Sequence, residues 1–389
     1  MGREHGATVQ VVQHFLKWTE TAKVNERAAA AAALARAYLG GTLTFEDRCA
    51  AEAALTALLD DPSSKVRAAL AEALSLSRHA PVQVVAALAA DQPDVAAPVL
   101  ARSPVLSDTD LIERVAEGRE ATQCLVALRP QLSMGVSAAI AEVGSAAACR
   151  ALLENAGADI AGLSFRRMVE RHGSDASLRE MLIRDRRLPP ECRHMLLIQL
   201  GETLRDAPLV KALVGAARAE RLTREACVRA SLKLIETIGP MEHTALVEHL
   251  RLHGDLSAGF IVRMVAHGKI DFFGAVLVAL TGQTEARIRS LLANGRDVAV
   301  AALLQKAGLG REMNMPILKA LGVWREVARG KRLAGAQEVS WLMLHSIGAT
   351  SGQAGPAPQL AELATLLRGI HLDALRENAR LQAQAIAAA

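Results

Sequence analysis

Apolar residues recur along this chain at helical spacing, in short runs separated by turns. The clearest run begins at Thr44, whose hydroxyl suits a helix N-cap, and ends before a turn at 60–62. Beyond that turn Val66, Leu70 and Leu74 recur every four residues, which places them on one face of a helix. We therefore predict two amphipathic helices joined by a tight turn.

This unit of two helices is repeated along the first half of the chain. A second copy covers residues 81–100, and Val66 and Val95 are 29 residues apart. Weaker copies follow at 107–129, 132–154 and 163–186. Such helices are too short to be stable alone, so each must bury its apolar face against its neighbours. The pattern predicts an all-α superhelix of stacked helical hairpins.

The helices lengthen from about residue 222 and lose the tight period. We predict helices at 222–238, 241–252, 256–267, 271–281, 284–294, 296–307, 311–329, 337–347 and 359–386. The glycines between them are expected to act as left-handed helix caps. The predicted organisation is a repeat solenoid over 1–221, a helical extension of it over 222–348, a linker over 349–358 and a terminal amphipathic helix over 359–389. That last helix either docks on the body or is offered to a partner.

Composition supports the all-helical prediction. Hydrophobic residues make up 51% of the 389 residues but aromatic residues only 3%, and alanine and leucine, the best helix formers, dominate. No run of eighteen apolar residues lacks charge, and the first five residues do not resemble a leader peptide. Five widely spaced cysteines favour buried thiols in a reducing compartment. We expect a cytoplasmic protein that is not in a membrane.

Residues 61–74 resemble the second helix of a HEAT repeat, with Asp61 six residues before Arg67. The resemblance implies that Asp61 and Arg67 stack between neighbouring units and hold them in register. In the second copy Ala96 stands where the arginine would be, so this Asp–Arg ladder is incomplete.

A closer resemblance lies in residues 66–111, above all in the order Pro98-Val-Leu, Ser103-Pro-Val-Leu-Ser-Asp and Asp110-Leu111. The segment is similar to an uncharacterised alphaproteobacterial family, a domain of unknown function with HEAT-like helical repeats. The specific similarity covers about residues 44–117, and the helical layout extends it to about residue 330. The resemblance implies the fold and a cytoplasmic location, but no catalytic residue and no ligand.

Residues that could bind a metal are few. His249 and His253 lie four apart on one helix, beside Glu248 and near His243, but the order is not that of a zinc hydrolase and a third ligand is not evident. Cys192 and His194 stand at alternating helix positions, which face apart. We interpret the histidines as exposed or core-edge residues and expect no metal, no cofactor and no catalytic site. The sequence also lacks a nucleophile elbow and a phosphate-binding glycine loop.

Charge is unevenly distributed along the chain. The net charge is +4 overall but −5 over residues 1–160, +6 over 161–235 and +3 over 236–389. The basic middle supplies the candidate binding residues Arg166, Arg167, Arg171, Arg184, Arg186 and Arg187. Arginine suits bidentate contact with carboxylate or phosphate. The alternative interpretation is a solvated face in which Glu170, Asp175, Glu180 and Asp185 balance these charges.

The sequence thus favours an interaction scaffold, since solenoids offer extended surfaces and the residues here serve packing. The basic middle predicts an acidic protein partner. The alternative is binding to the backbone of duplex nucleic acid, because Phe165 is the only aromatic residue of the basic stretch and could not stack successive bases. A third hypothesis, a base-excising or lyase-type enzyme, has no motif to support it.

Overall fold

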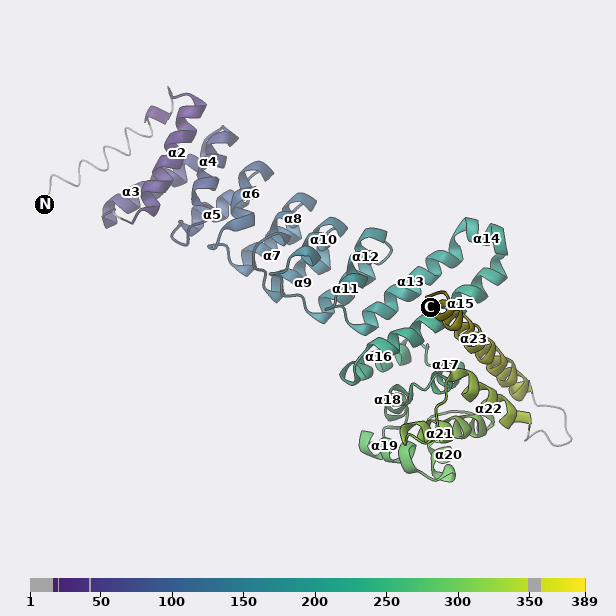
Figure 1. Cartoon of the computed structure of the whole chain (residues 1–389). Coiled ribbons are helices and arrows are strands. Elements are labelled where there is room, and N and C mark those ends of the chain that lie inside the picture. Colours follow the sequence, from purple (N-terminus) through teal and green to yellow (C-terminus); the bar gives the residue numbers. More distant parts are fainter. Residues whose placement is uncertain (1–16, 20, 42, 349–357, 389) are drawn as a thin grey trace. The chain divides into compact units, whose positions relative to one another are not determined.

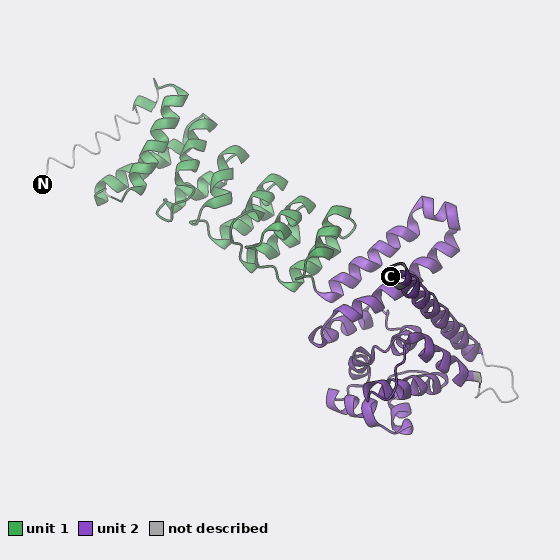
Figure 2. Ribbon diagram, in the orientation of Figure 1, with its two compact units in different colours: residues 1–188 green, residues 189–389 purple. Residues whose placement is uncertain are grey.

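The computed structural model describes residues 17–19, 21–41, 43–348 and 358–388, and in this part of the chain it is all-helical, with one isolated bridge (Leu132 to Ala158) and no strand. The chain forms two compact units, residues 1–188 and residues 189–389 (Figure 2). The first five residues lie outside the described residues. Of the predicted linker, 349–358, only Pro358 is described.

Unit 1 is built from two layers of short helices. One layer contains α2 (Val24–Leu39), α4 (Ser64–Leu74), α6 (Pro93–Arg102), α8 (Glu120–Ala127), α10 (Ala146–Glu154) and α12 (Ala176–Arg184). The other contains α3 (Phe45–Ala57), α5 (Val82–Ala89), α7 (Asp108–Glu117), α9 (Met134–Val143) and α11 (Gly162–His172), and a 3-10 turn, η1 (Leu58–Asp60), follows α3. Within the first layer each helix packs on the next, and α7, α9 and α11 do the same in the second (Figure 1).

The repeat predicted from the sequence corresponds to these hairpins. Thr44 caps α3 by accepting a hydrogen bond from the Asp47 amide, as its position predicted. Val66, Leu70 and Leu74 are fully buried on α4, because their four-residue spacing turns all three toward the second layer and toward the neighbouring hairpins. The helical periodicity was therefore sufficient to identify this core.

Unit 2 begins with a long helical hairpin, α13 (Pro190–Asp206) and α15 (Ala216–Thr237), joined by the short helix α14 (Pro208–Val214). There follow α16 (Pro240–Leu252), α17 (Ala258–Ala266), α18 (Ile270–Thr281), α19 (Glu285–Asn294), α20 (Asp297–Lys306), η2 (Arg311–Met313), α21 (Asn314–Ala328), α22 (Ala336–Gly348) and α23 (Pro358–Ala388). The unit starts at residue 189, whereas the sequence placed the change of organisation at 221–222. The earlier start reflects α13, which packs on α15 and α16.

The core of unit 2 surrounds α17. Six of its nine residues are buried, and it packs against α18, α21, α22 and α23. Helices distant in sequence therefore meet here, whereas in unit 1 each hairpin packs on its sequence neighbours. The region predicted as an extension of the solenoid thus has a different packing order.

The terminal helix α23 divides into two halves. Leu363, Leu367, Ile370 and Ala374 are buried and join the core of unit 2, mainly against α22. Beyond Ala374 the described side chains are exposed. The sequence left docking and display as alternatives, and the first half of the helix is docked.

Two expectations about single residues need correction. Gly282 caps α18 with a left-handed φ of 65°, as expected, but Gly295 after α19 is extended. Glycine is needed at 295 because a Cβ there would collide with the carbonyl oxygen of Leu291. The expectation of buried thiols is wrong at Cys49, which is exposed, and all five cysteines are free.

Candidate functional site

The six arginines of the predicted basic patch lie on α11, at the end of α12 and in the turn that follows. Two of them pair within their own helix: Arg166 donates to Glu170 over 2.9 Å and Arg184 donates to Glu180 over 2.6 Å. Both pairs are exposed, so each stabilises its helix only slightly. They nevertheless offset the charge that an acidic partner would meet.

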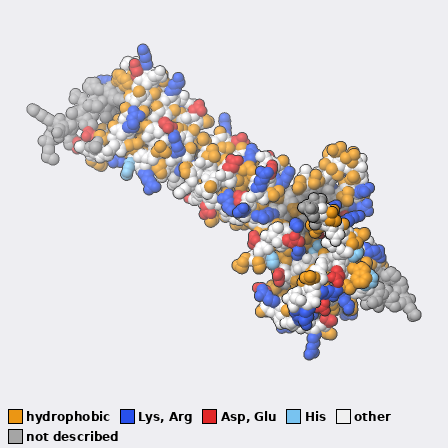
Figure 3. Space-filling model, viewed as in Figure 1, with side chains coloured by type: hydrophobic (Ala, Val, Ile, Leu, Met, Phe, Trp, Pro, Cys, Tyr) orange, Lys and Arg blue, Asp and Glu red, His pale blue; other side chains and the backbone are white. Residues whose placement is uncertain are grey.

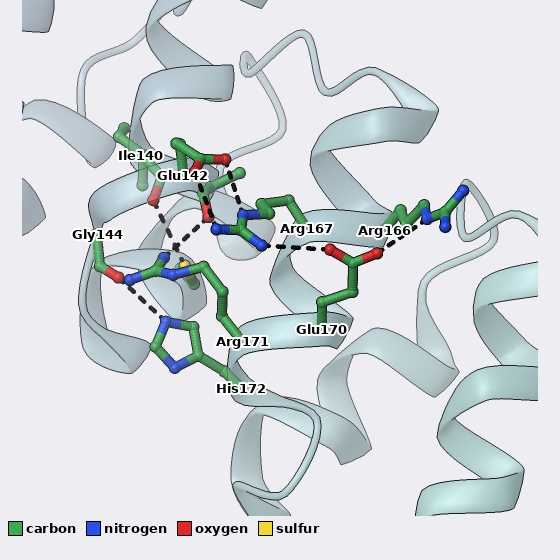
Figure 4. Close-up of polar contacts among 10 residues, drawn as sticks. Ile140, Glu142, Gly144, Arg166, Arg167, Glu170, Arg171 and His172 are labelled. Carbon is green, nitrogen blue, oxygen red and sulfur yellow. Dashed lines mark hydrogen bonds and ion pairs between the residues drawn. The ribbon is translucent and has the colours of Figure 1, made fainter.

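Arg167 and Arg171 connect α11 to α9 (Figure 4). Arg167 holds both carboxylate oxygens of Glu142 at 2.8 and 2.9 Å, and these hydrogen bonds, together with one to Glu170, raise the pKa of Arg167. Arg171 donates to the carbonyl of Ala141 over 2.9 Å. The bond from Arg171 satisfies a backbone carbonyl in the last turn of α9, which the helix itself leaves without a partner. Both arginines therefore join neighbouring hairpins.

Arg187 has a similar role one hairpin later. It pairs with Asp185 over 2.8 Å and lies 3.4 Å from the carbonyls of Leu153 and Ala158 in the preceding hairpin. Its guanidinium also lies 5.7 Å from the centre of the Phe165 ring. Arg186 is exposed. The structure thus brings these six residues into one region, and five of them, all but the exposed Arg186, form side-chain hydrogen bonds described above within unit 1.

The Asp–Arg contacts of the first repeats form a staggered chain. Asp61 accepts two hydrogen bonds from Arg27, at 2.8 and 3.1 Å. Arg27 lies on α2, the preceding helix of the first layer. Arg67 donates to the Asp61 carbonyl and to both carboxylate oxygens of Asp91, at 2.5 and 3.0 Å. Arg67 therefore contacts the backbone carbonyl of Asp61 and not its carboxylate. Each aspartate carboxylate pairs with an arginine of the preceding first-layer helix, Asp61 with Arg27 and Asp91 with Arg67.

Hydrogen bonds also lower the pKa values of the two aspartates in these contacts. Burial alone would raise the pKa of Asp61, but hydrogen bonds from Arg27 and the Ser63 amide, with the charge of both arginines, bring it below its usual range. The hydrogen bond from Arg67 likewise lowers the pKa of Asp91, against the effect of burial. Both carboxylates are therefore ionised at neutral pH and act as structural partners.

Two further residues that join hairpins were not anticipated from the sequence. Arg129 is buried and donates to the carbonyls of Leu100 and Ser103 over 2.6 Å each. Asn155 donates to the carbonyls of Ala127 and Arg129. Asn155 stands one residue, Arg129 two and Arg187 three residues after the end of a first-layer helix. A polar residue shortly after such a helix was the signal that could have identified them.

Three histidines meet inside unit 2. The Nδ1 of His194 on α13 lies 3.2 Å from the Nε2 of His249 on α16, so one ring donates to the other, and the His249 ring lies 4.2 Å from that of His253. Burial, with the charges of His249 and His253, lowers the pKa of His194 to about 4. The prediction of exposed or core-edge histidines is met at His253, which is exposed, but His243 and His249 are buried and His194 is almost fully buried.

Metal binding receives no support from this cluster. Glu248 points to Arg251, with which it forms two hydrogen bonds, and the His243 ring packs on Phe272. Over the described ranges, no group of three or more His, Cys, Asp or Glu side chains is arranged to hold a metal ion. The pair of His194 and His249 is a buried polar contact between α13 and α16.

A row of exposed apolar side chains follows the turns between successive hairpins of unit 1. We call it the inter-repeat edge. Its members stand at the start of a second-layer helix or at the end of a first-layer helix: Phe45, Leu76, Val82, Leu128, Met134, Leu163 and Ile183. Successive hairpins stack in the same orientation, so these ends lie along one side of the stack (Figure 1). Sequence periodicity missed this row because helix ends fall outside the buried stripe.

A groove of about 770 Å³ lies in unit 2 beside the start of α22. Its lining includes Leu333, Trp341, Glu338, His371 and Asn378. Glu338 is bonded to Arg332, and Asn378 donates to Gln337. The Asn378 bond thus joins α23 to α22, whereas the Glu338 bond joins α22 to the loop before it. No helix of the described residues is long and apolar enough to span a membrane.

Comparison with known proteins gives a family but no characterised relative. No curated protein and no solved structure matches the chain. A family model matches residues 95–355, which is 261 of the 389 residues and includes the segment Pro98–Leu111. The match begins within α6, in the second predicted repeat, so residues 44–94 of the predicted resemblance lie outside it. The chain therefore belongs to the family described as "Uncharacterised protein conserved in bacteria (DUF2336)".

Proposed function

We propose that this protein is a non-catalytic interaction scaffold in which unit 1, a HEAT-like stack, binds a protein partner along the inter-repeat edge. The observation that carries the proposal is the row of apolar side chains on that edge, of which Leu163 is 79% and Phe45 82% exposed. Single exposed apolar residues are ordinary on protein surfaces, but a series at equivalent turns of the stack, with the turn between α6 and α7 as the exception, provides an extended contact surface.

The partner expected from this surface is a protein segment that presents apolar side chains at intervals matching the repeat. Polar groups flank the row, as in other protein interfaces with an apolar centre and a polar rim. The arginines no longer favour an acidic partner, because Arg167 and Arg184 already hold carboxylates. The same pairs reduce the charge that these two arginines would offer to a phosphate backbone, on which the nucleic-acid alternative depends.

The proposal includes a cytoplasmic location, which the free thiols favour because such thiols persist in a reducing compartment. An alphaproteobacterial source remains a prediction from the segment Pro98–Leu111. HEAT-like stacking is supported by the two layers into which the hairpins of unit 1 place their helices. It is also supported by the Asp61 and Arg67 contacts, which link successive repeats.

Affinity capture from the native lysate with nuclease present tests the proposal. The two ends of α9 supply a matched pair of variants: Met134 stands first in the helix on the inter-repeat edge and is 52% exposed, while Val143 stands last, at the opposite edge, and is 44% exposed. Met134→Glu together with Leu128→Glu should abolish capture of the partner, and Val143→Glu should leave it intact. Equal capture by all three proteins, or capture lost with nuclease, would contradict the proposal.

A further inference from the structure

The hairpin of α13 and α15 has an uncovered apolar face in addition to its core contacts. The two helices approach closely where Gly201 meets Cys227, since a Cβ on Gly201 would collide with the sulfur. At their outer end α14, with the sequence Pro-Leu-Val-Lys-Ala-Leu-Val, has no buried residue. Leu209 and Leu213 are 70% and 75% exposed, and hydrophobic side chains gather at this end of the hairpin (Figure 3).

The apolar surface continues from α14 along one side of the hairpin. Helical geometry of about 100° per residue, counted from the contact of Gly201 with Cys227, turns Leu200 and Leu204 of α13 to the same side as Leu222 and Ala226 of α15. All four are exposed. The opposite side is charged and carries Glu202, Asp206, Glu220, Arg221 and Arg224. The hairpin is thus an amphipathic two-helix ribbon, which resembles one half of a four-helix bundle.

The charges beside Leu222 indicate what covers this face. Arg218 lies one turn before Leu222 and Glu225 one turn after it, on the outer edge of the apolar side. Within the described part of the chain neither side chain forms an ion pair or a hydrogen bond, although the charge of Glu225 also acts on Arg263 of α17. If α15 packs antiparallel on a second α15 with a twofold axis near Leu222, each Arg218 lies opposite the other copy's Glu225. The edge is therefore complementary to itself, as a twofold interface requires.

An anionic membrane fits the same face less well. Residues 202–225 contain five Lys and Arg but four Asp and Glu, and Asp206 is ionised between Arg205 and Lys211. This near balance gives little attraction to anionic lipid, for which an excess of basic residues is needed. We propose that the apolar face of the α13–α15 hairpin is a self-association surface that binds a second copy of this chain. The inference concerns unit 2 and is independent of the partner proposed for unit 1.

Sedimentation equilibrium of the full-length protein tests this proposal. The wild type should be a dimer, and Leu204→Glu with Leu222→Glu should raise the dissociation constant by at least about 100-fold, since two buried leucines are lost and two charges are buried. Leu381→Glu, at an exposed leucine on the free half of α23, is the matched control and should dimerise like the wild type. Circular dichroism checks that each variant keeps its helix content.

A charge exchange tests the arrangement itself. Arg218→Glu and Glu225→Arg should each weaken the dimer by about tenfold, because each creates two like-charge contacts, and the double variant should recover wild-type affinity. A wild type that stays monomeric at 100 µM, or leucine variants that dimerise normally, would overturn the proposal. So would flotation of a monomer with vesicles rich in phosphatidylglycerol, which would assign the face to a membrane.

Discussion

Arg167 of α11 holds both carboxylate oxygens of Glu142 on α9, at 2.8 and 2.9 Å, so a residue that the sequence assigned to binding joins two hairpins of unit 1. The pair is exposed on both sides, so its net contribution to the free energy of unfolding is small. The contact matters for the choice of variants that would locate a binding surface. A variant such as Arg167→Glu changes the contact with Glu142 as well as the surface charge, so loss of binding in that variant alone would not locate a partner.

Buried Arg129 should matter more for stability than the exposed pairs. Arg129→Met leaves the carbonyls of Leu100 and Ser103 without their donor, and unsatisfied buried groups of this kind cost about 1–3 kcal/mol each. We expect faster amide exchange in α6 and α8, measured by mass spectrometry. Arg102→Met removes only the exposed pair with Glu72 and should leave exchange nearly unchanged. Equal exchange in the two variants would refute the role assigned to Arg129.

The histidine contact predicts a pH dependence of unit 2. His194 has a pKa of about 4 in the folded protein, whereas an ordinary histidine has a pKa of about 6.5, so between these values the unfolded state binds more protons. The free energy of unfolding should therefore fall by up to about 3 kcal/mol as the pH drops from about 6.5 to about 4. His243, whose pKa burial also lowers, adds to the trend.

Urea unfolding followed by tryptophan fluorescence across this pH range measures that slope, since Trp324 and Trp341 both lie in unit 2. His194→Gln should flatten the slope, whatever its effect on stability at pH 7. His345→Gln, which changes a histidine stacked on Trp341, is the control and should keep the slope of the wild type. The account of His194 fails if its replacement leaves the slope unaltered.

Two glycines inside helices should respond oppositely to alanine. Gly201→Ala forces α13 away from Cys227 and should lower the free energy of unfolding by about 1–3 kcal/mol. Gly322 on α21 has open space where a Cβ would lie, so Gly322→Ala should raise it by about 0.5–1 kcal/mol through helix propensity. Thermal melts of both variants beside the wild type provide the comparison, and destabilisation by Gly322→Ala would contradict it.

The sequence was sufficient to predict the helix faces and the helix cap, which depend on residues close together in the chain. Val66, Leu70 and Leu74 share a helix face through local spacing alone, and Thr44 caps its helix through a residue three positions on. The partner of Arg167 was not predictable in this way, because Glu142 lies 25 residues earlier and is brought close only by stacking. The start of α15 at Ala216, six residues before the predicted one, was missed because residues 216–221 lack an apolar period.

The candidate binding surface was missed for a related reason. Periodicity identifies residues on the buried stripe of a helix, whereas Leu128 and Met134 stand on either side of a turn. Their alignment with Leu76, Val82 and Leu163 depends on how successive hairpins stack. A charged residue, by contrast, can be recognised in the sequence, but its ion-pair partner cannot. The arginines were therefore predicted to bind a partner, although they are paired within unit 1.

Site-specific photo-crosslinking in the native host tests the central claim most directly. A benzophenone side chain would replace Leu128 or Leu163 on the inter-repeat edge, and Glu117, exposed at the far end of α7, would be the control position. Our account predicts that both edge positions crosslink to the same protein and that position 117 does not. Crosslinks that form equally from position 117, or only to nucleic acid, would contradict it.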